Sequence, residues 1–340
     1  MSRNTEGRAT RRFRKIHPGI YTASLPLPGE KPGPANVYLF TGETNALLDT
    51  GTSRTAGILE GALAGLGMTF ADIDRLILTH GHIDHYGAAS YVKKRSRGRC
   101  RVEAHGGDLY RINTGLEAPV GSTFGFLALM GVPPALRVSM LSIFLVFKAL
   151  ARKVRVDRIL EDGDTVDVGN YTGRVLTTPG HTRGSICVHL ESEGLLFAGD
   201  HILGHITPNA LIMLDGTGPL PTRSPQDEFY ASVRRVEKLA PRVVHPGHGA
   251  PVDDLTGIAD MYRRTFAERQ KTVLSLIDSR TSTVYAMSRR LFSRNIKGVR
   301  APLELYLAVS EVYTHVQALE TAGAVTTRVR NGILEVRTAG

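Results

Sequence analysis

Four residues of the types that bind metal ions lie within six positions of the chain. They are His80, His82, Asp84 and His85, in the segment Thr79-His-Gly-His-Ile-Asp-His85. The preceding run Asp74-Arg-Leu-Ile-Leu-Thr79 predicts a buried strand that ends in a loop. Side chains alternate along a strand, so His80 and His82 should face one way while the following turn brings Asp84 and His85 from another direction. The cluster predicts a metal site, and its geometry suits two adjacent metals better than one.

Further ligand candidates follow other apolar segments. His181 comes after Val175-Leu-Thr-Thr-Pro-Gly, Asp200 after Gly194-Leu-Leu-Phe-Ala-Gly, and His248 after Arg242-Val-Val-His-Pro-Gly. Each stands beside glycine at the end of a predicted strand, where loops from a rigid sheet converge on a site. We therefore expect His181, Asp200 and His248 to complete the ligand set begun by the opening cluster.

Taken in chain order, these motifs resemble those of the metallo-β-lactamase superfamily of hydrolases, over roughly Phe13 to Asp254. The resemblance implies an α/β fold, a four-layer αβ/βα sandwich that binds metals along one edge of two packed sheets. It also implies that the aspartate of Leu47-Leu-Asp49-Thr-Gly51 supports the metal loop. The ligand assignment that follows from it gives one metal to His80, His82 and His181, the second to Asp84, His85 and His248, and a bridging role to Asp200.

The chemistry that the resemblance implies is hydrolysis by a hydroxide that bridges two divalent metal ions. Zinc is the expected metal, with iron or manganese as alternatives. Asp84 would orient the nucleophile or take up its proton, and His205 is a second candidate catalytic residue, with His201 as its neighbour in the same loop. The bridging Asp200 and His85 separate the chain from true β-lactamases, and His82 separates it from the di-iron flavoproteins, which carry glutamate there.

Three functions remain open at this point. The first is hydrolysis of a thioester, lactone or related ester with an apolar acyl part, on a small-molecule or carrier-bound substrate. The second is cleavage of single-stranded RNA, an activity found in the β-lactamase-like protein 2 group that the chain also resembles. The third is redox chemistry at one iron, as in persulfide dioxygenases.

An apolar insertion is expected at about 111–158. Gly131, Pro133 and Pro134 divide it into two short helices, and neither apolar run reaches the ~18 residues that cross a bilayer. A helical hairpin after a metal loop can form a lid or a wall of the substrate pocket. Packing against the sandwich, or contact with a second copy of the chain, is the alternative.

The segment 256–340 is predicted to be a small winged-helix domain. It reads as helices at 261–278, at 283–292 and from about Pro302 to Gly323, followed by two alternating strands joined by Asn331-Gly332. Its formal charge is +6 and that of the predicted tail 1–15 is +5, whereas the chain carries +10, so the catalytic part 16–255 is nearly neutral. The basic wing favours nucleic acid as a partner, but no aromatic residues interleave with its arginines, and we do not favour it.

Composition sets few other limits. The chain of 340 residues allows one large domain with an appendage, and it opens without an apolar signal-peptide core, which predicts a cytoplasmic enzyme. Its two cysteines give no disulfide framework, and Cys187 reads as a small core residue.

Overall fold

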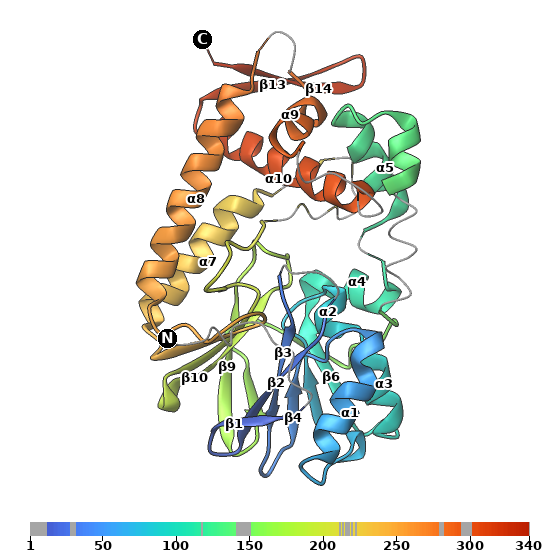
Figure 1. The fold of residues 1–340 in the computed structure, drawn as a ribbon, viewed down its shortest axis with the longest axis vertical. Coiled ribbons are helices and arrows are strands. Elements are labelled where there is room, and N and C mark those ends of the chain that lie inside the picture. The colour runs from blue at the N-terminus through green and yellow to red at the C-terminus, as the bar shows by residue number, and fades with distance from the viewer. Residues whose placement is uncertain are drawn as a thin grey trace, which may run out of the picture.

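Two β-sheets packed face to face lie at the centre of the lower part of the molecule, with helices on their outer faces (Figure 1). The computed structural model describes residues 12–27, 32–116, 118–140, 151–210, 212, 214, 218, 220–221, 223–278, 282–293 and 301–339.

The first sheet contains seven strands in chain order. Its antiparallel half runs from β1 to β4, and β4 to β7 are parallel. The strands are β1 (Arg14–His17), β2 (Ile20–Leu25), β3 (Ala35–Phe40), β4 (Ala46–Leu48), β5 (Arg75–Ile77), β6 (Arg101–His105) and β7 (Arg158–Leu160). Within the predicted tail 1–15, Arg14 and Lys15 belong to β1, and residues 1–11 lie outside the described part.

The second sheet has the order β12-β11-β10-β9-β8. Its strands are β8 (Thr165–Val168), β9 (Tyr171–Thr177), β10 (Ile186–Leu190), β11 (Leu195–Gly199) and β12 (Val243–Pro246). β11 and β12 are parallel, and the other neighbours are antiparallel. As a result β9, β11 and β12 all run in the same direction.

Alternation along the buried strands builds three apolar layers. In β3, Val37 and Leu39 face the helices, while Tyr38 and Phe40 face the second sheet. The helices on the first sheet include α1 (Ala56–Ala64) and α3 (Ala89–Arg95), and those on the second are α7 (Pro225–Leu239) and the first half of α8 (Leu255–Ser275). The predicted four-layer α/β sandwich is confirmed.

Local sequence explains where the outer helices begin. Ser224 accepts a hydrogen bond from the backbone N–H of Asp227 and precedes Pro225 at the first turn of α7. Asp254 caps α8 in the same way through the N–H of Gly257. Both helices then lay an apolar face on the second sheet, through residues such as Phe229 and Tyr262.

A second body of structure lies above the sandwich (Figure 1). It contains the three predicted C-terminal helices and the hairpin, in the order α8, α9 (Val284–Leu291), α10 (Ala301–Thr321), β13 (Val325–Arg330) and β14 (Ile333–Thr338). Thr283 caps α9, and Asn331 and Gly332 have φ values of 50° and 75°, as the hairpin turn requires. One difference concerns α8, which begins at Leu255 and runs from the sandwich into the upper body as a single helix.

The insertion packs against these C-terminal elements. It includes α4 (Leu109–Thr114), α5 (Val120–Leu129) and a helical stretch at 134–140; the rest of its predicted second helix, 141–150, lies outside the described residues. Phe126, Leu127 and Met130 are buried in one core with α9, α10 and the hairpin. The backbone N–H of Tyr285 also donates to the carbonyl of Met130 at 3.0 Å. α5 and the C-terminal segment thus share one hydrophobic core, whereas Ile112 of α4 and Val154 pack with the first sheet. Among the described helices, none is long and apolar enough to span a membrane.

Candidate metal centre

The seven predicted ligand residues lie together at one edge of the sandwich. They follow the carboxyl ends of β5, β9, β11 and β12, and the strands within each sheet that carry them run in the same direction, so the loops meet. Asp84 and His85 lie on the short helix α2 (Ile83–Tyr86), which begins directly after His82. All seven side chains are buried except for part of His82 and Asp84.

His80, His82 and His181 form the first ligand group. The Nδ1 atom of His82 lies 3.0 Å from Nε2 of His80 and 3.0 Å from Nε2 of His181. The three ligand atoms are within 4.8 Å of one another. His82 therefore presents Nδ1 to the group, whereas the other two histidines present Nε2.

Asp84, His85 and His248 form the second ligand group. The Nε2 atoms of His85 and His248 are 3.3 Å apart, and Oδ2 of Asp84 lies 3.4 Å from Nε2 of His248. Asp200 stands between the groups: its Oδ2 is 3.6 Å from Nε2 of His181 and 3.5 Å from Nε2 of His248, and its Oδ1 is 3.3 Å from Nε2 of His85.

This spacing fits metal ions. Two ligands that bind a tetrahedral ion at 2.0–2.1 Å lie about 3.3 Å from each other, close to the separations within both groups. Imidazole nitrogens and carboxylate oxygens are also donors that divalent transition metals accept. Packing alone does not explain five imidazole rings and two carboxylates with their polar atoms directed at one another. The chain therefore has the donors for two divalent ions, with Asp200 able to bind both.

Hydrogen bonds on the outer side of the rings fix which nitrogen faces the centre. Nδ1–H of His85 donates to Oδ2 of Asp49 at 2.8 Å, and Nδ1–H of His181 donates to the carbonyl of Asn209 at 3.0 Å. Nδ1–H of His248 donates to the carbonyl of Pro34 at 3.0 Å. In the neutral imidazole, each bond keeps the proton on Nδ1, so Nε2 is the nitrogen that is available to a metal.

The charges around the centre divide between the two groups. Burial, aided by the neighbouring imidazoles, lowers the pKa of His80 and His82 well below the ordinary value, so both are neutral ligands. For His248, burial opposes the charged form, but Asp200 and Asp84 outweigh it and raise the pKa to about 10. The same contacts hold the pKa of Asp200 well below its usual range against the effect of burial. The second group therefore concentrates negative charge that a cation would neutralise.

Asp49 supports the metal loop as expected, through three hydrogen bonds. Its Oδ1 accepts from the N–H of Thr79 at 2.8 Å, and its Oδ2 accepts from the Thr79 hydroxyl at 2.7 Å in addition to His85. Asp49 has φ 62°, the left-handed region that most residues avoid. These hydrogen bonds hold that conformation directly behind the ligands.

The remaining candidates have different surroundings. His205 is exposed; its Nε2–H donates to the carbonyl of Pro32 at 2.8 Å, and its ring lies beside Gly249, next to His248. His201 is buried with its ring against Phe229, 5.2 Å between centroids, and burial lowers its pKa to about 3. His201 is thus a neutral group in the core beneath α7, and the predicted catalytic role of His205 stays a prediction.

The structure also reveals residues that the motifs did not indicate. The buried side chain of Asn36 donates to the carbonyls of Pro246 and Gly249, at 3.0 and 2.9 Å, and so holds the His248 loop from the opposite sheet. Asp108 joins two ligand loops from the end of β6. Its position after a strand of the parallel half, like that of Asp49, was a signal that could have identified it.

A further contact connects the upper body to the first ligand group. The hydroxyl of Ser310 on α10 accepts from the N–H of Ile212 at 3.0 Å. Ile212 is three residues after Asn209, whose carbonyl orients His181. The C-terminal segment therefore fixes the chain that positions a ligand, although it contributes no ligand itself among the described residues.

Comparison with known proteins finds relatives that are named as hydrolases or thioesterases. The chain is 25% identical to a protein of Bacillus subtilis named probable metallo-hydrolase YqjP over 312 residues, which cover 86% of this chain and 90% of the relative. An atrochrysone carboxyl ACP thioesterase of Aspergillus fumigatus is 26% identical over 245 residues, 71% of this chain but only 44% of the relative.

A solved structure extends the likeness to the whole fold. A metallo-beta-lactamase family protein from Thermus thermophilus superposes with a TM-score of 0.80 at 27% identity, covering 95% of this chain and 99% of that one. The family model of the metallo-beta-lactamase superfamily matches residues 31–248, which include all seven candidate ligands. This protein therefore belongs to the metallo-beta-lactamase superfamily.

Proposed function

We propose that this metallo-hydrolase superfamily member binds two metal ions, most simply zinc, and cleaves a thioester, lactone or related ester. The observation that carries the proposal is the position of Asp200, within 3.6 Å of ligand atoms from both groups. With Asp200, each ligand group would have a fourth donor, which supports the binding of two ions side by side. The relative named as a thioesterase supports the choice of bond.

Two divalent ions at this centre would lower the pKa of coordinated water and polarise a substrate carbonyl. The protein's own groups then orient the reactants. Asp84 is the carboxylate best placed to take a proton from the attacking water, because its side chain is 19% exposed whereas that of Asp200 is 8% exposed. His205 is proposed as a donor to the substrate, which requires its Nε2–H to leave the carbonyl of Pro32.

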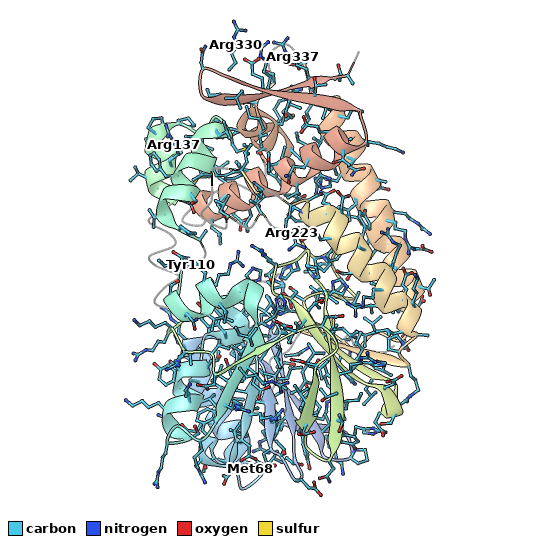
Figure 2. The ribbon with its side chains drawn as sticks, turned by 180° about the vertical axis from the view of Figure 1, so that it is seen from behind. Met68, Tyr110, Arg137, Arg223, Arg330 and Arg337 are labelled. Carbon is cyan, nitrogen blue, oxygen red and sulfur yellow. The ribbon has the colours of Figure 1, made fainter. Side chains whose placement is uncertain are left out.

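The preference for an apolar acyl part depends on the exposed side of the insertion. Phe126 and Met130 are buried in the shared core and cannot contact a substrate. Tyr110 and Val120 are 42% and 53% exposed, and Val138 is 62% exposed. Tyr110 lies on α4 at the top of the sandwich (Figure 2). These exposed side chains support an apolar wall near the insertion.

Cleavage of single-stranded RNA is the alternative that one observation favours. The N–H of Val336 donates to the carbonyl of Ser282 at 2.7 Å, and Thr283 forms a bridge with Glu335, so the start of α9 joins the hairpin as in a winged helix. Arg330 and Arg337 lie at the end of the molecule formed by this hairpin (Figure 2). We propose the winged-helix assignment of 256–340 on this basis, and rank RNA below esters because Arg337 is already paired with Glu335.

A substrate screen with metal counting tests the proposal. The screen compares three proteins on acyl thioesters, lactones and single-stranded RNA: the wild type, His82→Ala and the control His17→Ala. His17 pairs with Glu193 outside the metal centre. We expect ester turnover in the wild type and the control, at least ~100-fold less in His82→Ala, and two metals per wild-type chain. RNA cleavage that disappears in His82→Ala, without ester turnover, would overturn the choice of substrate. A single iron per chain would overturn the two-metal hydrolase and favour the redox alternative.

A further inference from the structure

Asp108 is a buried carboxylate that three donors surround. It ends the short 3-10 helix Gly106–Asp108 after β6 and is 1% exposed. Its Oδ2 accepts from the N–H of Gly81 at 2.7 Å and from the hydroxyl of Thr182 at 2.6 Å. Its Oδ1 accepts from the N–H of Gly184 at 3.2 Å.

The donors come from the two loops that supply the first ligand group. Gly81 stands between His80 and His82, and Thr182 directly follows His181. The hydrogen bonds described for the Asp108 side chain all go to these loops. The second ligand group has a different support, because His85 is held by Asp49 and His248 by the carbonyl of Pro34.

The two loops approach Asp108 more closely than most side chains would permit. A Cβ atom on Gly81 would lie 2.9 Å from Cβ of Asp108, and one on Gly184 would lie 2.6 Å from its backbone nitrogen. Real Cβ atoms do not make contacts this short, so glycine is required at both positions. Both loops therefore pack directly against Asp108.

We propose that Asp108 is a positioning residue for the first metal ion, an inference that rests on the proposed two-metal site. By binding both loops it fixes the separation of His82 from His181, whose ligand atoms are 3.0 Å apart. The three imidazoles then meet a tetrahedral ion without rearrangement of the backbone.

The role requires a carboxylate because all three partners donate. Asparagine has the same shape but only one acceptor oxygen, so in Asp108→Asn its NH₂ group must face either Gly184 or the Gly81–Thr182 pair. In either orientation at least one of the three hydrogen bonds is lost, while the fold retains the side-chain volume. Outer partners of ligands typically contribute about 10–100-fold to metal affinity, and we expect a loss of this size at the first site alone.

The test is a zinc titration of metal-free wild-type protein, Asp108→Asn and Thr182→Val, with Asp162→Asn as the matched control. Asp162 likewise accepts from one backbone N–H and one hydroxyl, both of Thr177, at 2.9 and 3.2 Å, but it lies outside the metal centre. We expect Asp108→Asn to weaken one of two sites about 10–100-fold, Thr182→Val to weaken the same site less, and Asp162→Asn to leave both sites unchanged.

Each other outcome has a defined meaning. Three results would overturn the positioning role. They are equal weakening of both sites in Asp108→Asn, unchanged zinc affinity in both Asp108→Asn and Thr182→Val, and the same loss of affinity in Asp162→Asn. Thr182→Val keeps the inference testable even where Asp108→Asn does not fold. The titration uses no substrate, so absence of ester turnover with the expected binding pattern would refute only the proposed reaction.

Discussion

Replacing Asp49 by asparagine should weaken metal binding at the second ligand group while the chain stays folded. In Asp49→Asn, an oxygen can remain at the Oδ1 position and still accept from the N–H of Thr79. The NH₂ group then replaces Oδ2, which accepts from the Thr79 hydroxyl and from Nδ1–H of His85. His85 can accept this new donor only by moving its proton to Nε2, the atom that faces the metal.

Asp49→Asn and Asp49→Ala should differ in their effect on the free energy of unfolding, for structural reasons. Asp49→Asn should lower zinc affinity about 10–100-fold, or about 1.4–2.8 kcal/mol, the usual effect of losing the outer partner of a histidine ligand. Its cost in stability is small because asparagine tolerates the φ of 62°. Asp49→Ala removes all three acceptor contacts and leaves their buried donors without a partner. We therefore expect this variant to lose about 3–5 kcal/mol of the free energy of unfolding.

The assay combines zinc titration with urea unfolding of the metal-free proteins. Asp49→Asn should retain most of the unfolding free energy and lose one tight site, whereas Asp49→Ala should lose both stability and that site. Two tight sites in Asp49→Asn would refute the reasoning, because His85 would then coordinate without the carboxylate that fixes its tautomer.

Four other predictions concern the wider structure. Ser310→Ala removes the acceptor of Ile212 N–H and should cost about 1–3 kcal/mol in urea unfolding, with weaker zinc binding at the first group; Ser310→Thr should restore both. Phe126→Ala should cost about 3–5 kcal/mol through a cavity, and hydrogen exchange should show that the insertion and the C-terminal helices open together. The hydrogen bond from Arg235 lowers the pKa of Asp162, so this pair stabilises the fold above the ordinary carboxyl pKa and its contribution disappears as pH falls through the lowered value. Both side chains are over 40% exposed, so Asp162→Asn should lower the free energy of unfolding by less than about 1 kcal/mol near neutral pH. Unfolding measured as a function of pH should show that this difference becomes smaller at acid pH. Chelation should lower the melting temperature measured by thermal unfolding, and free zinc at ~1,000 times Kd should add about 4 kcal/mol for each occupied site.

Local sequence determined the residue types at the centre and the elements that carry them. Each ligand follows an apolar strand or a Pro-Gly turn, and each signal extends over a short stretch of chain. The C-terminal hairpin was equally predictable, because Asn-Gly readily adopts the positive φ values that the turn at Asn331 and Gly332 requires. Such features depend on φ/ψ preferences and on alternation, which a short segment expresses by itself.

Tertiary structure decided how those residues work together. His82 presents Nδ1 to the centre and His181 presents Nε2. This choice of nitrogen depends on contacts with residues far away in sequence, such as the carbonyl of Asn209. The partners of Asp108 are 27 to 76 residues away, and no motif announces them. The insertion likewise finds its apolar partners in the C-terminal helices, far along the chain. The chain determines its ligands locally, but close packing of distant loops sets their distances and tautomers, because a hydrogen bond between remote segments exists only once the fold brings them together.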